Sequence, residues 1–149
     1  MTLEADIAAL KKLPLFRALP SPRLKLVALM GEKLSYAPGD ALVESGTTPD
    51  GMFVILSGEV ELSHREAGEH GRRIRLGTGM TVGDVPMLCG QSHTAEVTAA
   101  TDVVALRLPK DIFFELLQTV PDFNAALTRD LASRLYKLAH RVLDEEKAD

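Results

Sequence analysis

The segment 82–97, VGDVPMLCGQSHTAEV, combines residue types that suit a pocket for a small anion. Gly83 and Asp84 open a short apolar run, and His93 and Thr94 follow the turn at Gly90. Glycine lets a backbone approach a ligand closely, and histidine can donate a hydrogen bond to an anion. The segment contains neither Lys nor Arg. It therefore predicts an anion-type pocket that lacks a cation of its own.

Short strands between recurring turns must position this segment. Turn signals such as Pro38-Gly39-Asp40 recur about every 8 to 12 residues between Leu34 and Leu108. The runs between them read MFVIL, EVELS, RRIRL, AEVTA and DVVALRL. This spacing predicts an antiparallel sandwich or barrel, with strands that pair mainly with their neighbours in sequence.

Segments with helical periodicity lie before and after these strands. Residues 3–12 carry apolar side chains at helical spacing, and Ser21-Pro22 is typical of an N-cap followed by proline at the first helical position. A short helix is predicted to begin at Lys110, and a last helix to cover residues from about 122 to 146. The chain is thus expected to be one α+β, mainly β domain, with helices at both ends of the barrel.

The last helix carries a regular apolar stripe. Its members are spaced four, four, three and four residues apart, which approaches a heptad seam from Leu131 onward; they are Leu127, Leu131, Leu135, Leu138 and Val142. The stripe indicates either a homodimer interface or burial against the rest of the monomer.

Composition narrows the classes of protein that fit. The 149 residues, 46% hydrophobic and 26% charged, are typical of one soluble globular domain. The net charge of −4 argues against a nucleic-acid-binding surface, and no apolar run has the length of a membrane-spanning helix. One cysteine and no signal peptide predict a reducing compartment, the cytoplasm, with Cys89 as a small core residue.

The order of these motifs resembles the cyclic nucleotide-binding domain family. The matching stretches cover about residues 10 to 143, and they are LPLFRALP, YAPGDALVESGTTPDGMFVILSGEVEL, IRLGTGMTVGDVPML and TAEVTAATDVVALRL. The resemblance implies an antiparallel jelly-roll β-barrel at 34–108, after an N-terminal helical segment at 1–33 and before hinge and dimerisation helices at 109–149. It also implies cAMP or cGMP as ligand, held by a phosphate-binding cassette at 82–97.

The resemblance assigns the ligand contacts to cassette residues. They are Gly83, Asp84, Val85, Pro86, His93 and Thr94. The amides of a short helix would face the cyclic phosphate. The closest type is a catabolite-activator-like sensor domain, and because the chain ends at Asp149 no DNA-binding domain is expected within it.

Two cassette positions depart from the family pattern. The usual Phe-Gly-Glu is Val82-Gly83-Asp84, so the carboxylate that would bind the ribose is one methylene shorter. The usual arginine is His93, and loss of a buried charged partner costs about 2–5 kcal/mol. Affinity is therefore expected to fall by about one to three orders of magnitude. On the last helix, Leu138 and Ala139 stand where catabolite activators present hydroxyls to the purine.

Several side chains keep two interpretations. Asp84 either binds a ribose or caps the cassette helix. His93 alternates with Ala95, Val97 and Ala99, which places it toward the barrel interior. It is either a pH-dependent phosphate contact or a partly buried histidine bonded to a carbonyl or water. The basic stretch HGRRIRL either binds an acidic partner or forms a solvated hairpin.

These readings favour a non-enzymatic regulatory module that binds a cyclic nucleotide weakly or with altered specificity. A degenerate pocket that serves protein interaction or dimerisation is the alternative. A cupin-like metalloenzyme is remote, because metal sites need several converging ligands. The four histidines, His64, His70, His93 and His140, include no His-x-His pair. No metal and no cofactor beyond the nucleotide ligand are expected.

Overall fold

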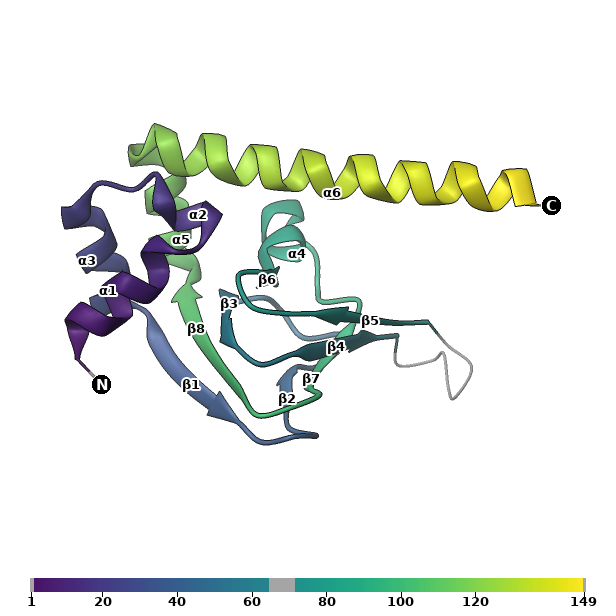
Figure 1. Cartoon of the computed structure of the whole chain (residues 1–149), viewed down its shortest axis with the longest axis horizontal. Coiled ribbons are helices and arrows are strands. Elements are labelled where there is room, and N and C mark those ends of the chain that lie inside the picture. The colour runs from purple at the N-terminus through teal and green to yellow at the C-terminus, as the bar shows by residue number, and fades with distance from the viewer. Residues whose placement is uncertain (1, 65–71, 149) are drawn as a thin grey trace.

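The computed structural model describes residues 2–64 and 72–148, which form two packed antiparallel sheets flanked by helices (Figure 1). One sheet has the order β1-β8-β3-β6 and the other the order β2-β7-β4-β5. The strands of the first sheet are β1 (Glu32–Tyr36), β8 (Val103–Pro109), β3 (Gly51–Ser57) and β6 (Thr81–Val82). Those of the second are β2 (Ala41–Val43), β7 (Glu96–Ala99), β4 (Val60–Ser63) and β5 (Arg73–Leu76).

The predicted jelly-roll architecture is confirmed, but the predicted pairing of sequence neighbours is wrong. Among the strands of the described residues, only β4 and β5 pair as consecutive strands, whereas β1 pairs with β8 and β2 with β7. Strands from the beginning and the end of the barrel segment therefore lie side by side. Most strand pairs form when the roll closes and not as local hairpins. All five predicted runs form strands; β1, β2 and β6 were not among them.

Strand β3 divides the hydrophobic core in two. Met52 and Val54 face one side, with the helices, while Phe53 and Ile55 face the barrel interior. Successive side chains of a strand point to opposite faces. Burial of both faces explains why this segment reads as a continuous apolar run without polar alternation.

The helical core joins the two ends of the chain. It contains α1 (Leu3–Lys11), α2 (Pro14–Arg17), α3 (Ser21–Met30), α5 (Lys110–Thr119) and the first part of α6 (Pro121–Ala148). Phe123 of α6 packs against Phe16 and Phe113, with ring centroids 6.1 and 6.0 Å apart. Helix α3 begins one residue earlier than predicted, with Pro20 as its cap, so Ser21 makes no capping hydrogen bond.

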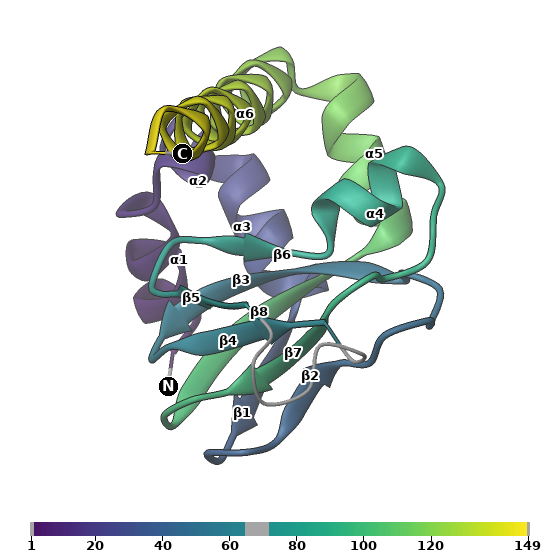
Figure 2. The ribbon, with the colours of Figure 1, turned by 90° about the vertical axis from the view of Figure 1, so that its right-hand side faces the viewer.

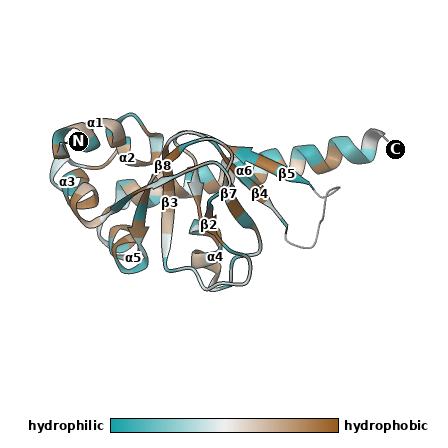
Figure 3. Cartoon of the chain, turned by 90° about the horizontal axis from the view of Figure 1, so that it is seen from below, coloured by the Kyte–Doolittle hydropathy of each residue, from teal (hydrophilic) through white to brown (hydrophobic). Residues whose placement is uncertain are grey.

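Helix α6 runs across the molecule on the same side as α4 (Asp84–Cys89) and continues beyond the barrel (Figures 1 and 2). Its first half is anchored, because Leu127 is buried and Leu131 packs against the helical core. Leu131 therefore belongs to the monomer core and not to a free seam. Leu135, Leu138 and Val142 are 67%, 54% and 49% exposed, and hydrophobic bands mark this far half in Figure 3.

Candidate ligand-binding site

A cavity of about 330 Å³ opens between the second sheet, α4 and α6. The structure brings together all of the predicted site residues, because Gly83, Asp84, Val85, Pro86, His93 and Thr94 line this cavity. Arg134 of α6 lines it as well. The remaining wall is mostly apolar and comes from Leu62, Ile74, Leu76, Thr81, Val82, Ala95 and Val97.

Gly83 has a conformation and a position that exclude a side chain. It caps α4 with a φ of +90°, in the left-handed region that glycine adopts without strain. A Cβ atom there would lie 3.0 Å from the carbonyl oxygen of Gly51 and 3.3 Å from Cε1 of His93. Gly83 thus lets the backbone of Gly51 and the ring of His93 approach the start of α4 closely.

Asp84 is buried, and its carboxylate is held from three directions. Its Oδ1 accepts a hydrogen bond of 3.0 Å from the amide of Val85. Asp84 is the first residue of α4 and Gly83 is the N-cap, with no capping hydrogen bond from a side chain, so the interpretation of Asp84 as the helix cap is wrong. Its Oδ2 accepts hydrogen bonds from Oγ1 of Thr81 at 2.9 Å and from Nη2 of Arg134 at 2.7 Å. A buried carboxylate needs such partners, since an unpaired charge away from water is costly.

Arg134 brings a cation to a cavity whose cassette has none. Burial works to lower the pKa of Arg134, but the hydrogen bonds and charges of Asp84 and Asp130 raise it above the ordinary value. Its Nε and Nη2 reach Asp130, and Nη2 also reaches Thr81. Nη1 makes no hydrogen bond to another residue in the described part of the chain, so its two N–H groups remain for a ligand.

His93 lines the same cavity as this ion pair, and its Cε1 comes within 3.3 Å of the position that a Cβ atom of Gly83 would occupy. Its backbone is fixed by hydrogen bonds to Thr47 and from Gly46, and the residue is buried. The imidazole bonds to no other described residue, and no fully buried side-chain nitrogen among those residues lacks a partner, so its ring nitrogens are accessible, and the residue lines the cavity. Burial lowers the pKa of His93 below its ordinary value, and the charge of Asp50 offsets only part of this effect.

The sequence of this chain matches a known protein family. A family model described as the cyclic nucleotide-binding domain matches residues 33–120, more than half of the chain. The chain belongs to this family.

This cyclic nucleotide-binding domain is similar to three known proteins in sequence or structure. The cAMP-dependent protein kinase regulatory subunit of Aspergillus fumigatus is 30% identical over 116 residues, which are 77% of this chain but only 27% of that protein. A cAMP-binding acyltransferase from Mycobacterium smegmatis has 27% identity and a TM-score of 0.76, over 91% of this chain and 42% of that one. The sensor domain of the transcriptional regulator DNR from Pseudomonas aeruginosa covers 93% of both chains with a TM-score of 0.79. Its identity is 16%, so that likeness concerns the fold alone.

The first turn of α4 offers this domain few free amides. The amide of Val85 already donates to Asp84, Pro86 has no N–H, and the amide of Met87 donates to the carbonyl of Gly83 at 3.3 Å. An anion in this cavity would therefore depend on side chains more than on the helix terminus.

Arg134 was the functional residue that the sequence interpretation missed. Two signals pointed to it: its spacing of four residues from Asp130, and its place in the LASRL stretch of the last helix. The sequence interpretation instead considered Leu138 and Ala139 as the positions of the last helix that face the ligand, and neither of these lines the cavity. The apolar wall from β4 and β5, with Leu62, Ile74 and Leu76, was not among the predicted site residues either.

The other sequence hypotheses have clear outcomes. Cys89 is exposed, so its prediction as a core residue is wrong: α4 buries Asp84 and Met87, and Cys89 lies off that face. Each arginine of the basic stretch pairs within the chain, in the ion pairs Arg72–Glu145, Arg73–Glu61 and Arg75–Glu59, which favours the hairpin interpretation.

Within residues 2–64 and 72–148, no group of three or more potential metal ligands comes together, and His70 lies outside these ranges. No helix in the same ranges is long and apolar enough to cross a membrane.

Proposed function

We propose that this domain is a non-enzymatic regulatory module of the cytoplasm that binds cAMP or cGMP, with low affinity, in the cavity between β4–β5, α4 and α6. The observation that carries the proposal is the arrangement of polar groups around Gly83. Asp84 and Arg134 form an ion pair in the cavity lining, and His93, which lies close to Gly83, and Thr94 line the same cavity. A volume of about 330 Å³ suits a ligand of nucleotide size.

The ribose is assigned to the Asp84–Arg134 end. A carboxylate can accept a hydrogen bond from a sugar hydroxyl, and the free Nη1 of Arg134 can donate one. The carboxylate of Asp84 already accepts three hydrogen bonds, so a ribose must share it with Thr81 and Arg134. This sharing, added to the shorter side chain, weakens the contact.

The cyclic phosphate is assigned to His93 and Thr94. Neutral histidine supplies one donor where arginine would supply a charged fork. The purine is assigned to the apolar wall, which includes Leu62, Ile74 and Leu76, because no hydroxyl of α6 lines the cavity within the described residues. Contact with an apolar wall favours either purine, so discrimination between cAMP and cGMP is expected to be small.

Arg134 supplies a route from the cavity to α6. A ligand shifts a conformational equilibrium only through different affinity for the two states. Competition between the ribose and Arg134 for Asp84 gives such a difference, because Arg134 ties α6 to α4. The exposed Leu135, Leu138 and Val142 of the same helix would then pair with a second copy, as a homodimer.

Calorimetry with cAMP, cGMP, adenosine and guanosine on wild type and on His93→Arg tests the proposal. Wild type should bind both cyclic nucleotides weakly, and His93→Arg should bind them at least about tenfold more tightly. The nucleosides, which carry no phosphate, should gain nothing from the substitution. His140→Arg, on exposed α6, is the matched control for added charge.

Absence of binding by both wild type and His93→Arg would overturn the proposal. That outcome would favour the alternative, a degenerate pocket in a protein-interaction module. Equal gains for nucleosides and cyclic nucleotides would contradict the assignment of the phosphate to His93.

A further inference from the structure

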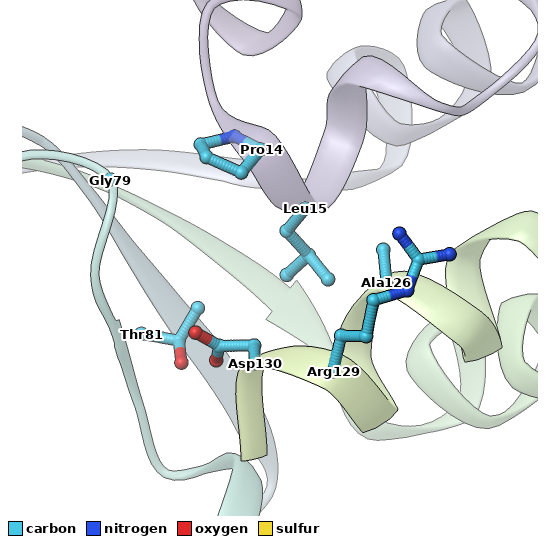
Figure 4. A pocket seen from close by; sticks show the side chains of 7 residues that line it. All are labelled: Pro14, Leu15, Gly79, Thr81, Ala126, Arg129 and Asp130. Carbon is cyan, nitrogen blue, oxygen red and sulfur yellow. The ribbon is translucent and has the colours of Figure 1, made fainter. Parts of the chain in front are cut away.

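A second cavity of about 310 Å³ lies on another side of α6, between α2 and the turn that precedes β6 (Figure 4). Its lining residues come from α2, the turn before β6, β6 itself and α6, and they are Pro14, Leu15, Gly79, Thr81, Ala126, Arg129 and Asp130. Of these, only Thr81 also lines the nucleotide-type cavity, so the two hollows are separate and share one wall.

On the Asp130 side of this second cavity, one guanidinium is shared between two carboxylates. Asp130 pairs with Arg134 through Oδ2, but Arg134 is shared with Asp84. One guanidinium therefore faces two carboxylates. Oδ1 of Asp130 accepts no hydrogen bond from another described residue, and Figure 4 shows the carboxylate directed toward Thr81 at the cavity wall. An ammonium group placed there would balance the cluster.

Arg129 gives the opposite side a positive charge. Its guanidinium makes no ion pair or hydrogen bond with another residue of the described ranges. In Figure 4 it points away from Asp130, although the two residues are adjacent on α6. A guanidinium without a partner is a suitable contact for a carboxylate.

Between the two charged groups the lining is apolar. The side chain of Leu15 lies between Asp130 and Arg129 in Figure 4, with Pro14 above it and Ala126 beside it. Apolar lining with a few placed polar groups is what small-molecule sites have in common. This lining favours a methylene chain between the charged ends of a ligand.

We propose that this cavity binds a small zwitterion of the ω-amino carboxylate class. Its ammonium group pairs with Asp130, its carboxylate pairs with Arg129, and its methylene chain lies on Leu15 and Pro14. Since Asp130 also holds Arg134, such a ligand lies one side chain away from the nucleotide-type cavity.

Lys137 is the other cation close to this site. It lines a smaller hollow of about 140 Å³, together with Thr81, Asp130, Ser133 and Arg134. It does not line the second cavity itself. Lys137→Gln therefore removes a positive charge from the same helix without touching the proposed carboxylate contact, and it serves as the matched control for Arg129→Gln.

The test is binding of 6-aminohexanoate, hexanoate and hexylamine to the full chain, measured by calorimetry and by NMR chemical shifts. The zwitterion should bind at least about threefold more tightly than either singly charged analogue. Arg129→Gln should remove the preference for 6-aminohexanoate over hexylamine. Asp130→Asn should remove the preference over hexanoate. Lys137→Gln should keep both preferences.

Equal binding of hexanoate and 6-aminohexanoate, or loss of binding in Lys137→Gln but not in Arg129→Gln, would overturn the proposal. Absence of 6-aminohexanoate binding by folded wild type would overturn it as well. A cAMP titration of Arg129→Gln keeps this result distinct from the proposed nucleotide function, because Arg129 does not line the nucleotide-type cavity.

Discussion

Arg134 of α6 donates a 2.7 Å hydrogen bond to Asp84 of α4, across fifty residues of chain. Asp84 is 1% exposed, so this contact neutralises a charge that is almost fully removed from water. It also makes the position of α6 depend on the cassette. Anything that binds Asp84 or Arg134 therefore acts on both elements.

Removal of Arg134 should destabilise the domain. Arg134→Gln leaves the buried carboxylate of Asp84 with Thr81 and an amide as partners, and is expected to lower the free energy of unfolding by about 1–3 kcal/mol. Urea denaturation measures this loss. Arg141→Gln, on the same helix and without a partner among the described residues, should change the free energy by less than about 0.5 kcal/mol.

A double substitution checks the origin of that loss. In Arg134→Gln with Asp84→Asn the buried charge is gone, so the combined cost should be smaller than the sum of the two single costs. Strict additivity would show that the two side chains do not interact in solution.

Replacement of Gly83 should destabilise the domain through both backbone strain and crowding of the new Cβ atom. Gly39, at which only the strain applies, allows the two effects to be measured separately. Gly83 and Gly39 have nearly equal φ values, +90° and +92°, so alanine meets the same backbone strain at both. Only at Gly83 does the new Cβ crowd the carbonyl of Gly51 and the ring of His93, whereas nothing lies within 4 Å at Gly39. Gly83→Ala should therefore lower the free energy of unfolding by about 1–2 kcal/mol more than Gly39→Ala. Equal losses would mean that the cavity wall yields without cost.

The sequence predicted most strands and the cassette because their signals are local. Runs such as MFVIL and DVVALRL carry strand propensity within themselves, and Gly83, Asp84 and His93 lie within twelve residues of one another. The pairing of β1 with β8 carries no local signal, since it depends on closure of the whole roll. The sequence interpretation did not place Arg134 in the site, because its contact with Asp84 exists only once α6 crosses the barrel.

The pH dependence of His93 gives a prediction with opposite signs for ligand binding and for stability. Its pKa in the folded protein lies below the ordinary value of 6.5, mainly because the ring is buried. The unfolded chain then binds more protons near this pH, so stability is fully present above pH 6.5 and falls as the pH drops through the folded pKa. A bound cyclic phosphate favours the protonated ring, so affinity for cAMP should rise over the same interval.

Calorimetry and urea denaturation between pH 5 and 8 on wild type and His93→Gln measure both effects. His93→Gln should show neither the rise in affinity nor the part of the stability loss that His93 causes. The charge that acts on the ring is that of Asp50, which is retained in this variant, as are Asp84 and Arg134 of the same cavity. A cAMP affinity in wild type that stays constant over this range would exclude His93 as a phosphate contact.

The exposed half of α6 predicts a homodimer that two substitutions should abolish. Leu135 and Leu138 are 67% and 54% exposed, so Leu135→Glu with Leu138→Glu removes apolar area from the surface without opening a cavity in the monomer. Sedimentation should show a dimer for wild type at micromolar concentration and a monomer for the double variant. Leu131→Ala is the contrasting change: Leu131 packs against the helical core, so its loss should lower the stability of the monomer as well. A monomeric wild type at this concentration would leave the apolar face of α6 without a second copy of the chain as its partner.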